Sequence, residues 1–196
     1  MAQLGAGAGD GAAAGAGAAF GVRFAADFFA GDLPALAFLA DFLPAFLADF
    51  FGAAAEGLAN VIHHIFNDKG RPNGYITGEE GSGAIGIGLR YGGGRLHLKR
   101  MAGTTPCYWQ GPSVGFDTGG NASKVFTLVY RMTDPNRLFQ RFPGVDGSAY
   151  FVGGFGANYQ QSGRTILAPI RAGVGFRLGA NIGYLNYSRR RRLNPF

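Results

Sequence analysis

After Pro72, glycine alternates with bulky apolar residues at a period of two, and this pattern restricts the folds open to the chain. Residues 84–91 read AIGIGLRY, so the large apolar side chains share one face of an extended strand, opposite a nearly bare face that carries Arg90. Residues 173–178 read GVGFRL and repeat the arrangement. A strand that is bulky on one face and bare on the other is typical of a sharply curved sheet. We therefore expect curved β-structure with its bulky faces turned inward.

Several other segments alternate like strands. Residues 95–99 (RLHLK) predict Leu96 and Leu98 on the inward face and His97 on a solvent-exposed face. The segments 92–94 (GGG) and 179–181 (GAN) have the composition of hairpin connections. Further strands are expected over residues 75–79, 107–110, 113–117, 124–130, 148–155, 165–171 and 182–188, some of them halves of one bent strand.

Short strands and hairpin turns indicate a sandwich or a small barrel. We predict a mainly β fold, a small antiparallel β-barrel of about eight strands, because few of these segments carry the charge or proline that protects an exposed edge. Pro169 inside a strand pattern indicates an edge or a bulge. Asp134 and Pro135 predict a short connecting helix that runs through Leu138 and Phe139 and ends before Pro143.

Residues 45–68 have helical periodicity, which predicts a helix that packs on the barrel and ends at the C-cap Gly70. His63 and His64 are adjacent and so lie about 100° apart on a helix. They therefore cannot both face one ion from the same stripe of the helix. We expect no metal site.

Residues 1–44 differ from the rest in composition. Residues 1–19 are nearly all Ala and Gly, and an aromatic, acidic stretch follows. We expect residues 1–44 to be a low-complexity, largely disordered leader and residues 45–196 to form the domain. Aspartate and proline interrupt the apolar stretch, so we predict that the chain is not transmembrane. The basic segment that opens a secretory signal is not visible.

The charge is unevenly distributed. Residues 1–52 carry one basic and five acidic residues, a net charge of −4, so the rest of the chain carries +10 toward the total of +6. Such an excess favours anionic partners, among them phosphorylated lipid, anionic glycolipid and nucleic acid. The run Arg189-Arg190-Arg191-Arg192 is either a solvated tail or a contact for phosphate-bearing surfaces, and we take it, with Tyr108 and Trp109, as the candidate binding set. We expect no nucleic-acid binding, because most aromatic residues fall on the bulky faces.

Motifs for catalysis are missing. The three histidines lie at positions 63, 64 and 97, and no Gly-x-Ser-x-Gly elbow occurs. Glu79 and Glu80 are neighbours that point to opposite faces of a strand, and Asp134 serves as a helix cap. Cys107 has no cysteine partner. We expect no catalytic residue, no cofactor and no enzymatic activity.

The stretch from residue 51 to 196 resembles the envelope integrity protein A family of Gram-negative bacteria, a family of unknown molecular function. The matching segments are EGL (56–58), GRPNGYI (70–76), GLRYG (88–92), YWQGPS (108–113), GGNASKVF (119–126), RFPG (141–144) and GVG (173–175), followed by the basic C-terminus. Residues 109–129 are also similar, more weakly, to SYLF lipid-binding domains.

The resemblance implies a non-enzymatic periplasmic β-barrel that supports cell-envelope integrity. With the +10 charge of the body, it predicts contact with an anionic envelope component, such as anionic lipid or lipopolysaccharide, or with an envelope protein partner. The alternative is a lipid-binding or lipid-carrying barrel, in which Ile85, Ile87, Val174 and Phe176 line a cavity instead of a solid core. The ligand and the oligomeric state stay open at this stage.

Overall fold

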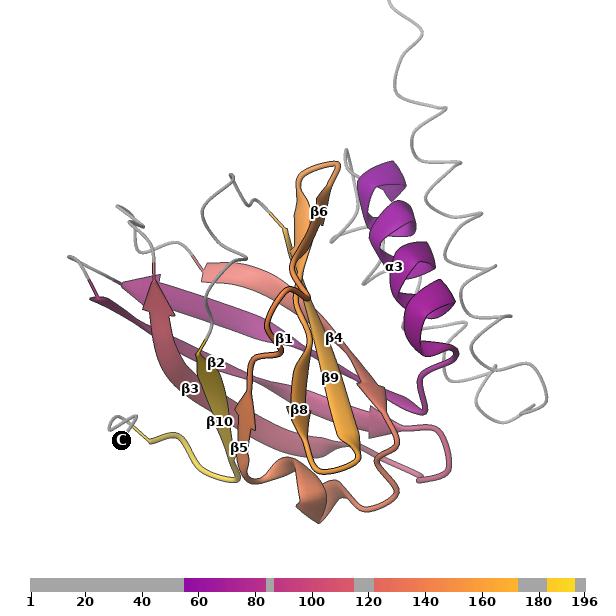
Figure 1. Ribbon diagram of the computed structural model, residues 1–196. Coiled ribbons are helices and arrows are strands. Elements are labelled where there is room, and N and C mark those ends of the chain that lie inside the picture. The colour runs from indigo at the N-terminus through magenta and orange to yellow at the C-terminus, as the bar shows by residue number, and fades with distance from the viewer. Residues whose placement is uncertain (1–54, 84–86, 115–121, 173–182, 193–196) are drawn as a thin grey trace, which may run out of the picture. The chain divides into compact units, whose positions relative to one another are not determined.

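Where the structure describes the chain after Pro72, its glycine-rich segments form an antiparallel sheet (Figure 1). The computed structural model describes residues 55–83, 87–114, 122–172 and 183–192. In these ranges the chain forms α3 (Ala55–Lys69), β1 (Gly74–Gly83), β2 (Ile87–Leu98), β3 (Thr105–Val114), β4 (Ala122–Tyr130), the 3₁₀ helix η1 (Pro135–Leu138), β5 (Arg141–Pro143), β6 (Tyr150–Val152), β7 (Phe155–Ala157), β8 (Gln160–Ser162), β9 (Thr165–Ala172) and β10 (Tyr184–Ser188).

The sheet curls until its two ends meet. Its order runs β5-β10-β3-β2-β1-β4-β9, and β8 pairs with β9. Just past β5, Gly144 forms an isolated antiparallel bridge with Gln160 of β8, and the amide of Val145 donates a hydrogen bond to the carbonyl of Tyr159 over 2.8 Å. Figure 1 shows β5 and β8 side by side at this closure seam. The predicted mainly β, barrel-like fold is confirmed, with eight strands around the ring and the β6–β7 hairpin joined to β9.

Two strand boundaries differ from the prediction. The segment 92–94 is not a hairpin, because β2 runs unbroken from Ile87 to Leu98 and pairs with β1 and β3 through these glycines. Residues 148–155 are not one strand either, because Gly153 and Gly154 adopt φ angles of 56° and 82° and turn the chain between β6 and β7. Residues 107–117 were predicted as two strands or two halves of one, and the described part is the single strand β3. The second predicted hairpin, at 179–181, lies outside the described residues.

The glycines of β2 allow a close approach inside the barrel. A Cβ atom on Gly94 would lie 2.2 Å from the carbonyl oxygen of Thr77 in β1, and one on Gly92 would lie 2.2 Å from the indole of Trp109 in β3. The bare face of β2 is therefore the inward one. Arg90 on this face is 2% exposed, whereas Leu89 and Tyr91 on the bulky face are half-buried. The predicted orientation was wrong at this strand, because Trp109 fills the interior space that the glycines leave.

The opposite face of the sheet is covered where β1, β2 and β4 carry Tyr75, His97 and Phe126. His97, expected in solvent, is 8% exposed and stacks on Tyr75 with a ring-centroid distance of 4.5 Å. Phe126 of β4 packs against Tyr75 at 5.6 Å. Leu96 is buried and Leu98 packs partly buried against the core, as predicted. The alternation placed Leu96 and His97 on opposite faces correctly, but it did not show that the outer face is covered at His97.

The smaller elements follow their local signals. Gly70 (φ 75°) ends α3 and donates to the carbonyl of Phe66 over 2.8 Å, as a C-cap glycine does. The Asp134 side chain caps η1 by accepting from the amide of Asn136 over 2.9 Å. Pro169 of β9 pairs with β4 on one side. On the other side of β9, β7 and β8 pair with the residues before and after Pro169, and Pro169 itself lies in the gap between these two strands. The part of the predicted helix before residue 55 and the predicted leader lie outside the described residues.

Within α3, Val61, Ile62 and Ile65 are buried and both histidines are exposed. His64 stacks on Tyr150 of β6 at 3.8 Å between ring centroids. In the ranges that the structure describes, no helix has the length and apolarity to cross a membrane.

The replacement Gly94→Ala should destabilise the barrel by about 2 kcal/mol or more, because the new methyl group would overlap a backbone oxygen that cannot move away cheaply. Gly81→Ala is the matched control, since a Cβ atom there meets nothing within 4 Å. Its stability should change by less than about 1 kcal/mol. Urea denaturation of the two variants measures the difference, and equal stabilities would contradict the close approach.

Because His97 is buried, we expect the protein to lose stability in mild acid. Burial, followed by the charge of Arg95, lowers its pKa to about 4. Because the unfolded chain binds a proton near pH 6.5, acidification favours unfolding, and the stability present above pH 6.5 falls by about 2 kcal/mol by pH 5. Denaturation curves at pH 7.5 and pH 5 should show this loss in the wild type and a smaller loss in His97→Phe. Parallel losses in the two proteins would show that His97 is not the group that titrates.

Candidate functional site

A buried carboxylate joins four strands inside the barrel. Glu80 of β1 accepts hydrogen bonds at Oε1 from Arg90 (3.0 Å) and from Nε of Arg171 (2.9 Å). Its Oε2 accepts from the indole Nε1 of Trp109 (2.8 Å) and from a second nitrogen of Arg171 (3.3 Å). Arg171 also donates to the side-chain oxygen of Asn158 over 3.2 Å. These contacts bring β1, β2, β3 and β9 together at one point.

The alternation of the strands places these groups in the interior. Glu80 follows Ile76 at a spacing of four residues in β1, and Arg90 precedes Leu96 at a spacing of six in β2, so each shares the inward face of a core residue. Glu80 and Arg171 are each 5% exposed. The three charged groups together carry a net charge of +1 inside the protein.

The electrostatics keep Glu80 ionised. Burial alone would raise the pKa of this carboxyl group, but the charges of Arg171 and Arg90, with the hydrogen bonds from Arg171 and Trp109, outweigh that effect and hold the pKa below its usual value. Each carboxylate oxygen already accepts two hydrogen bonds. Glu80 is thus a structural anion, and its oxygens are engaged within the protein.

Next to this cluster lies a cavity of about 310 Å³, which we call the arginine–tyrosine cavity. Gly81, Gly92 and Gly93 form its bare floor. In the register of the sheet, Gly93 of β2 lies between Glu79 of β1 and Tyr108 of β3. The remaining side chains that line it are Glu80, Tyr91, Trp109, Gln110, Arg191 and Arg192. The cavity is therefore a hollow in a β-surface, with aromatic rings at its sides and two guanidinium groups from the C-terminal segment.

Four of the six predicted binding residues line this cavity. The guanidinium of Arg191 lies 6.0 Å from the centre of the Tyr108 ring, and Arg192 and Trp109 complete the set. The indole of Trp109 is 3% exposed and donates to Glu80, so it shapes the site from within.

The other two predicted residues lie elsewhere. Arg189 stacks on the ring of Phe139 at 4.4 Å and hydrogen bonds to the side chain of Asn136. Arg190 is exposed, and its carbonyl oxygen accepts a hydrogen bond from the hydroxyl of Ser188 over 2.7 Å.

The chemistry of the arginine–tyrosine cavity suits binding. Guanidinium groups recognise phosphate and carboxylate through paired hydrogen bonds, and tyrosine rings offer flat apolar faces. The exposed Glu79 adds a carboxylate, which accepts hydrogen bonds from hydroxyl groups, and the buried Gln110 completes the lining. The combination fits an anionic group carried on a polar or ring-shaped body.

Sequence reasoning missed the Glu80 cluster. The usable signal was the even spacing of six residues between Arg90 and the inward residue Leu96. If the strand continues through residues 92–94, this spacing places both side chains on the same face. Because those glycines were predicted to form a turn, Arg90 and Leu96 were assigned to two different strands and their faces were not compared. The partnership with Arg171 has no local signal, since 91 positions separate it from Glu80.

Glu80→Gln should lower the free energy of unfolding at pH 7 by about 3–5 kcal/mol, because two buried guanidinium groups would lose their counter-charge. The stability from Glu80 is present above the ordinary glutamate pKa of about 4.3 and is lost as pH falls through the lowered folded pKa. The gap between wild type and variant should therefore narrow below about pH 4. Glu79→Gln, at the neighbouring exposed position, is the control and should change stability by less than about 0.5 kcal/mol. A pH-independent gap in chemical denaturation would contradict the role of the charge.

Comparison with known proteins agrees with this architecture. A solved structure of an uncharacterized, beta-barrel-like protein from Brucella abortus matches with a TM-score of 0.68 and 49% sequence identity, over 76% of this chain and 92% of that one. A search of curated proteins finds no match. The sequence profile of the family described as envelope integrity protein A matches residues 40–196. The chain thus belongs to the envelope integrity protein A family.

Proposed function

We propose that this protein supports the cell envelope as a non-enzymatic periplasmic binding module, and that it holds an anionic envelope component in the arginine–tyrosine cavity. The observation that carries the proposal is the meeting of Arg191 and Arg192 with Tyr108 over a glycine floor. Two cations of the C-terminal segment are thereby placed beside aromatic rings.

The electrostatic balance supports an anionic ligand. Inside the barrel, Arg90 and Arg171 share one carboxylate. Arg191 and Arg192 are exposed, and in the described ranges neither forms an ion pair. The family description adds a role in envelope integrity, where anionic lipids and glycolipids provide surfaces that attract clustered arginine.

The proposal of a non-enzymatic role is supported by the state of the titratable groups. Glu80 has both oxygens engaged, and His97 is buried in a ring stack. The remaining histidines lie on the exposed side of α3. Glu79 is the carboxylate of the cavity that these contacts leave available, and no histidine is among the residues that line the cavity.

The lipid-carrying alternative stays a prediction. Ile85, Val174 and Phe176, which would line its cavity, lie outside the described residues. The described interior contains a packed cluster in which Tyr187 contacts Phe142 at 5.6 Å and Trp109 at 5.9 Å between ring centroids.

The double charge reversal Arg191→Glu with Arg192→Glu tests the proposal. Each arginine near an anionic surface contributes about 1 kcal/mol, so the variant should bind vesicles of phosphatidylglycerol at low salt at least about thirtyfold more weakly than wild type. The control is Lys99→Glu with Arg100→Glu, which makes the same change in net charge in the turn after β2, away from the cavity.

Sedimentation of protein with vesicles gives the affinities. If the control variant binds vesicles less than about threefold more weakly than wild type, the loss of affinity in the cavity variant is due to the cavity. Equal losses in the two variants would reduce the interaction to overall charge and overturn the site. Undiminished binding in the cavity variant, with lipid that co-purifies in native mass spectrometry, would favour the lipid-carrying barrel.

A further inference from the structure

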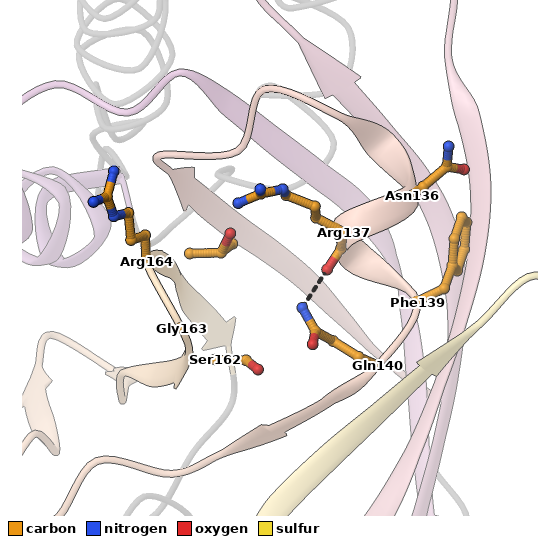
Figure 2. A pocket seen from close by; sticks show the side chains of 8 residues that line it. Asn136, Arg137, Phe139, Gln140, Ser162, Gly163 and Arg164 are labelled. Atoms are coloured by element: carbon orange, nitrogen blue, oxygen red, sulfur yellow. Dashed lines mark hydrogen bonds between the residues drawn. The ribbon is translucent and has the colours of Figure 1, made fainter.

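A second polar groove crosses the closure seam of the barrel. It encloses about 440 Å³ and shares no lining residue with the arginine–tyrosine cavity. One wall is η1 and the residues before β5, and the other is the β8–β9 turn. Figure 2 shows the side chains that matter for its chemistry: Asn136, Arg137, Gln140, Ser162, Arg164 and Thr165. We call this the seam groove.

Both walls of the seam groove carry an arginine. In the view of Figure 2 the Arg137 side chain extends from η1 toward the β8–β9 turn, and the Arg164 side chain extends from that turn away from Arg137. Both side chains are exposed, and among the described residues neither forms an ion pair. The nearest acidic residue in the η1 sequence, Asp134, is occupied as the helix cap. Two arginines therefore line one groove, and none of the residues that line it is acidic.

Arg189 adds a third positive charge next to the η1 wall of the seam groove. It hydrogen bonds to Asn136 and lies 4.4 Å from the centre of the Phe139 ring, and both of these residues line the seam groove. The C-terminal arginine run thus serves both cavities, with Arg189 at the seam groove and Arg191 at the other site. A positive potential in a concave surface raises the local concentration of anions.

The remaining lining groups are hydrogen-bonding groups of neutral charge. The amide of Gln140 donates to the carbonyl of Arg137 over 2.7 Å, which fixes the wall on which that arginine stands. Ser162 and the buried Thr165 line the groove with hydroxyl groups, and Asn136, whose side-chain oxygen accepts from Arg189, adds an amide nitrogen. A volume of about 440 Å³ is within the range of small-molecule sites and is much larger than a single phosphate ion.

From this set of groups we infer that the seam groove binds a phosphate group carried on a polyhydroxylated body, that is, a sugar phosphate, either free or as the head group of a glycolipid. Arg137 and Arg164 hold the phosphate from the two walls, and the amides and hydroxyls meet the sugar. Because the walls belong to the two sides of the closure seam, the bound anion also links β5 to β8 and stabilises the closed barrel.

The test is titration of the full chain with glucose 1-phosphate, with inorganic phosphate and glucose as separate probes. Loss of one charge-assisted hydrogen-bonding partner should weaken binding of glucose 1-phosphate about tenfold or more in each of Arg137→Gln and Arg164→Gln. Arg100→Gln, an exposed arginine outside both cavities, makes the same charge change and should bind as wild type does. The Arg191→Glu/Arg192→Glu variant should also bind as wild type does, which separates this site from the proposed function.

The melting temperature is a second readout, because a bound anion that links β5 to β8 should stabilise the closed barrel. Glucose 1-phosphate should raise the melting temperature of the wild type and of Arg100→Gln but not of the two groove variants. Vesicles that contain lipid A assign the source: competition with glucose 1-phosphate indicates a glycolipid head group, and no competition indicates a free sugar phosphate. Equal affinity for inorganic phosphate would overturn the sugar specificity. Unchanged affinity in the groove variants, or no binding of glucose 1-phosphate, would overturn the site.

Discussion

The carboxylate of Glu80 is the interaction on which the interior of this barrel depends. It is shared by guanidinium groups from β2 and β9 and by the indole of β3, so strands distant in sequence are held at one depth of the barrel. Removing one member of a buried ion cluster leaves the others uncompensated, which costs far more than an exposed pair contributes. Because the hydrogen bonds need one register, a shift of any of these strands by one residue would turn a charge to the wrong face.

The glycines and Trp109 belong to the same arrangement. The indole needs both the hydrogen bond to Glu80 and a bare backbone to lie on, and Gly92 supplies that backbone. On the other side of the indole, Tyr187 and Phe142 continue the packing into the apolar core. Cys107 lies in this core, where burial raises the pKa of its thiol to about 12 and so keeps it protonated. The interior thus has a charged end and an apolar end that meet at one tryptophan.

The sequence was sufficient for features that depend on local chemistry. Alternation identified the strands, Gly70 and Asp134 marked the ends of helices, and the arginine run was a visible source of charge. The errors came from residues whose role depends on partners far away in the chain. Glycines 92–94 have the composition of a turn, and only Trp109 and Thr77 explain why they belong to a strand. His97 sits on an alternate position, and only Tyr75 shows that this face is covered.

The candidate sites were predictable to a similar extent. The arginine run could be proposed as a binding element, but sequence could not divide it between two cavities. That division arises because the chain after β10 passes Phe139 at one residue and Tyr108 two residues later, so each aromatic ring receives a different guanidinium. The fold therefore treats its positive charge in two ways. Arg90 and Arg171 are buried against Glu80 and maintain the barrel. The arginine pairs at the arginine–tyrosine cavity and the seam groove line hollows instead, and among the described residues they form no ion pair. Cations that a protein neutralises internally serve its stability, and cations that it gathers in concave surfaces are available for an external anion.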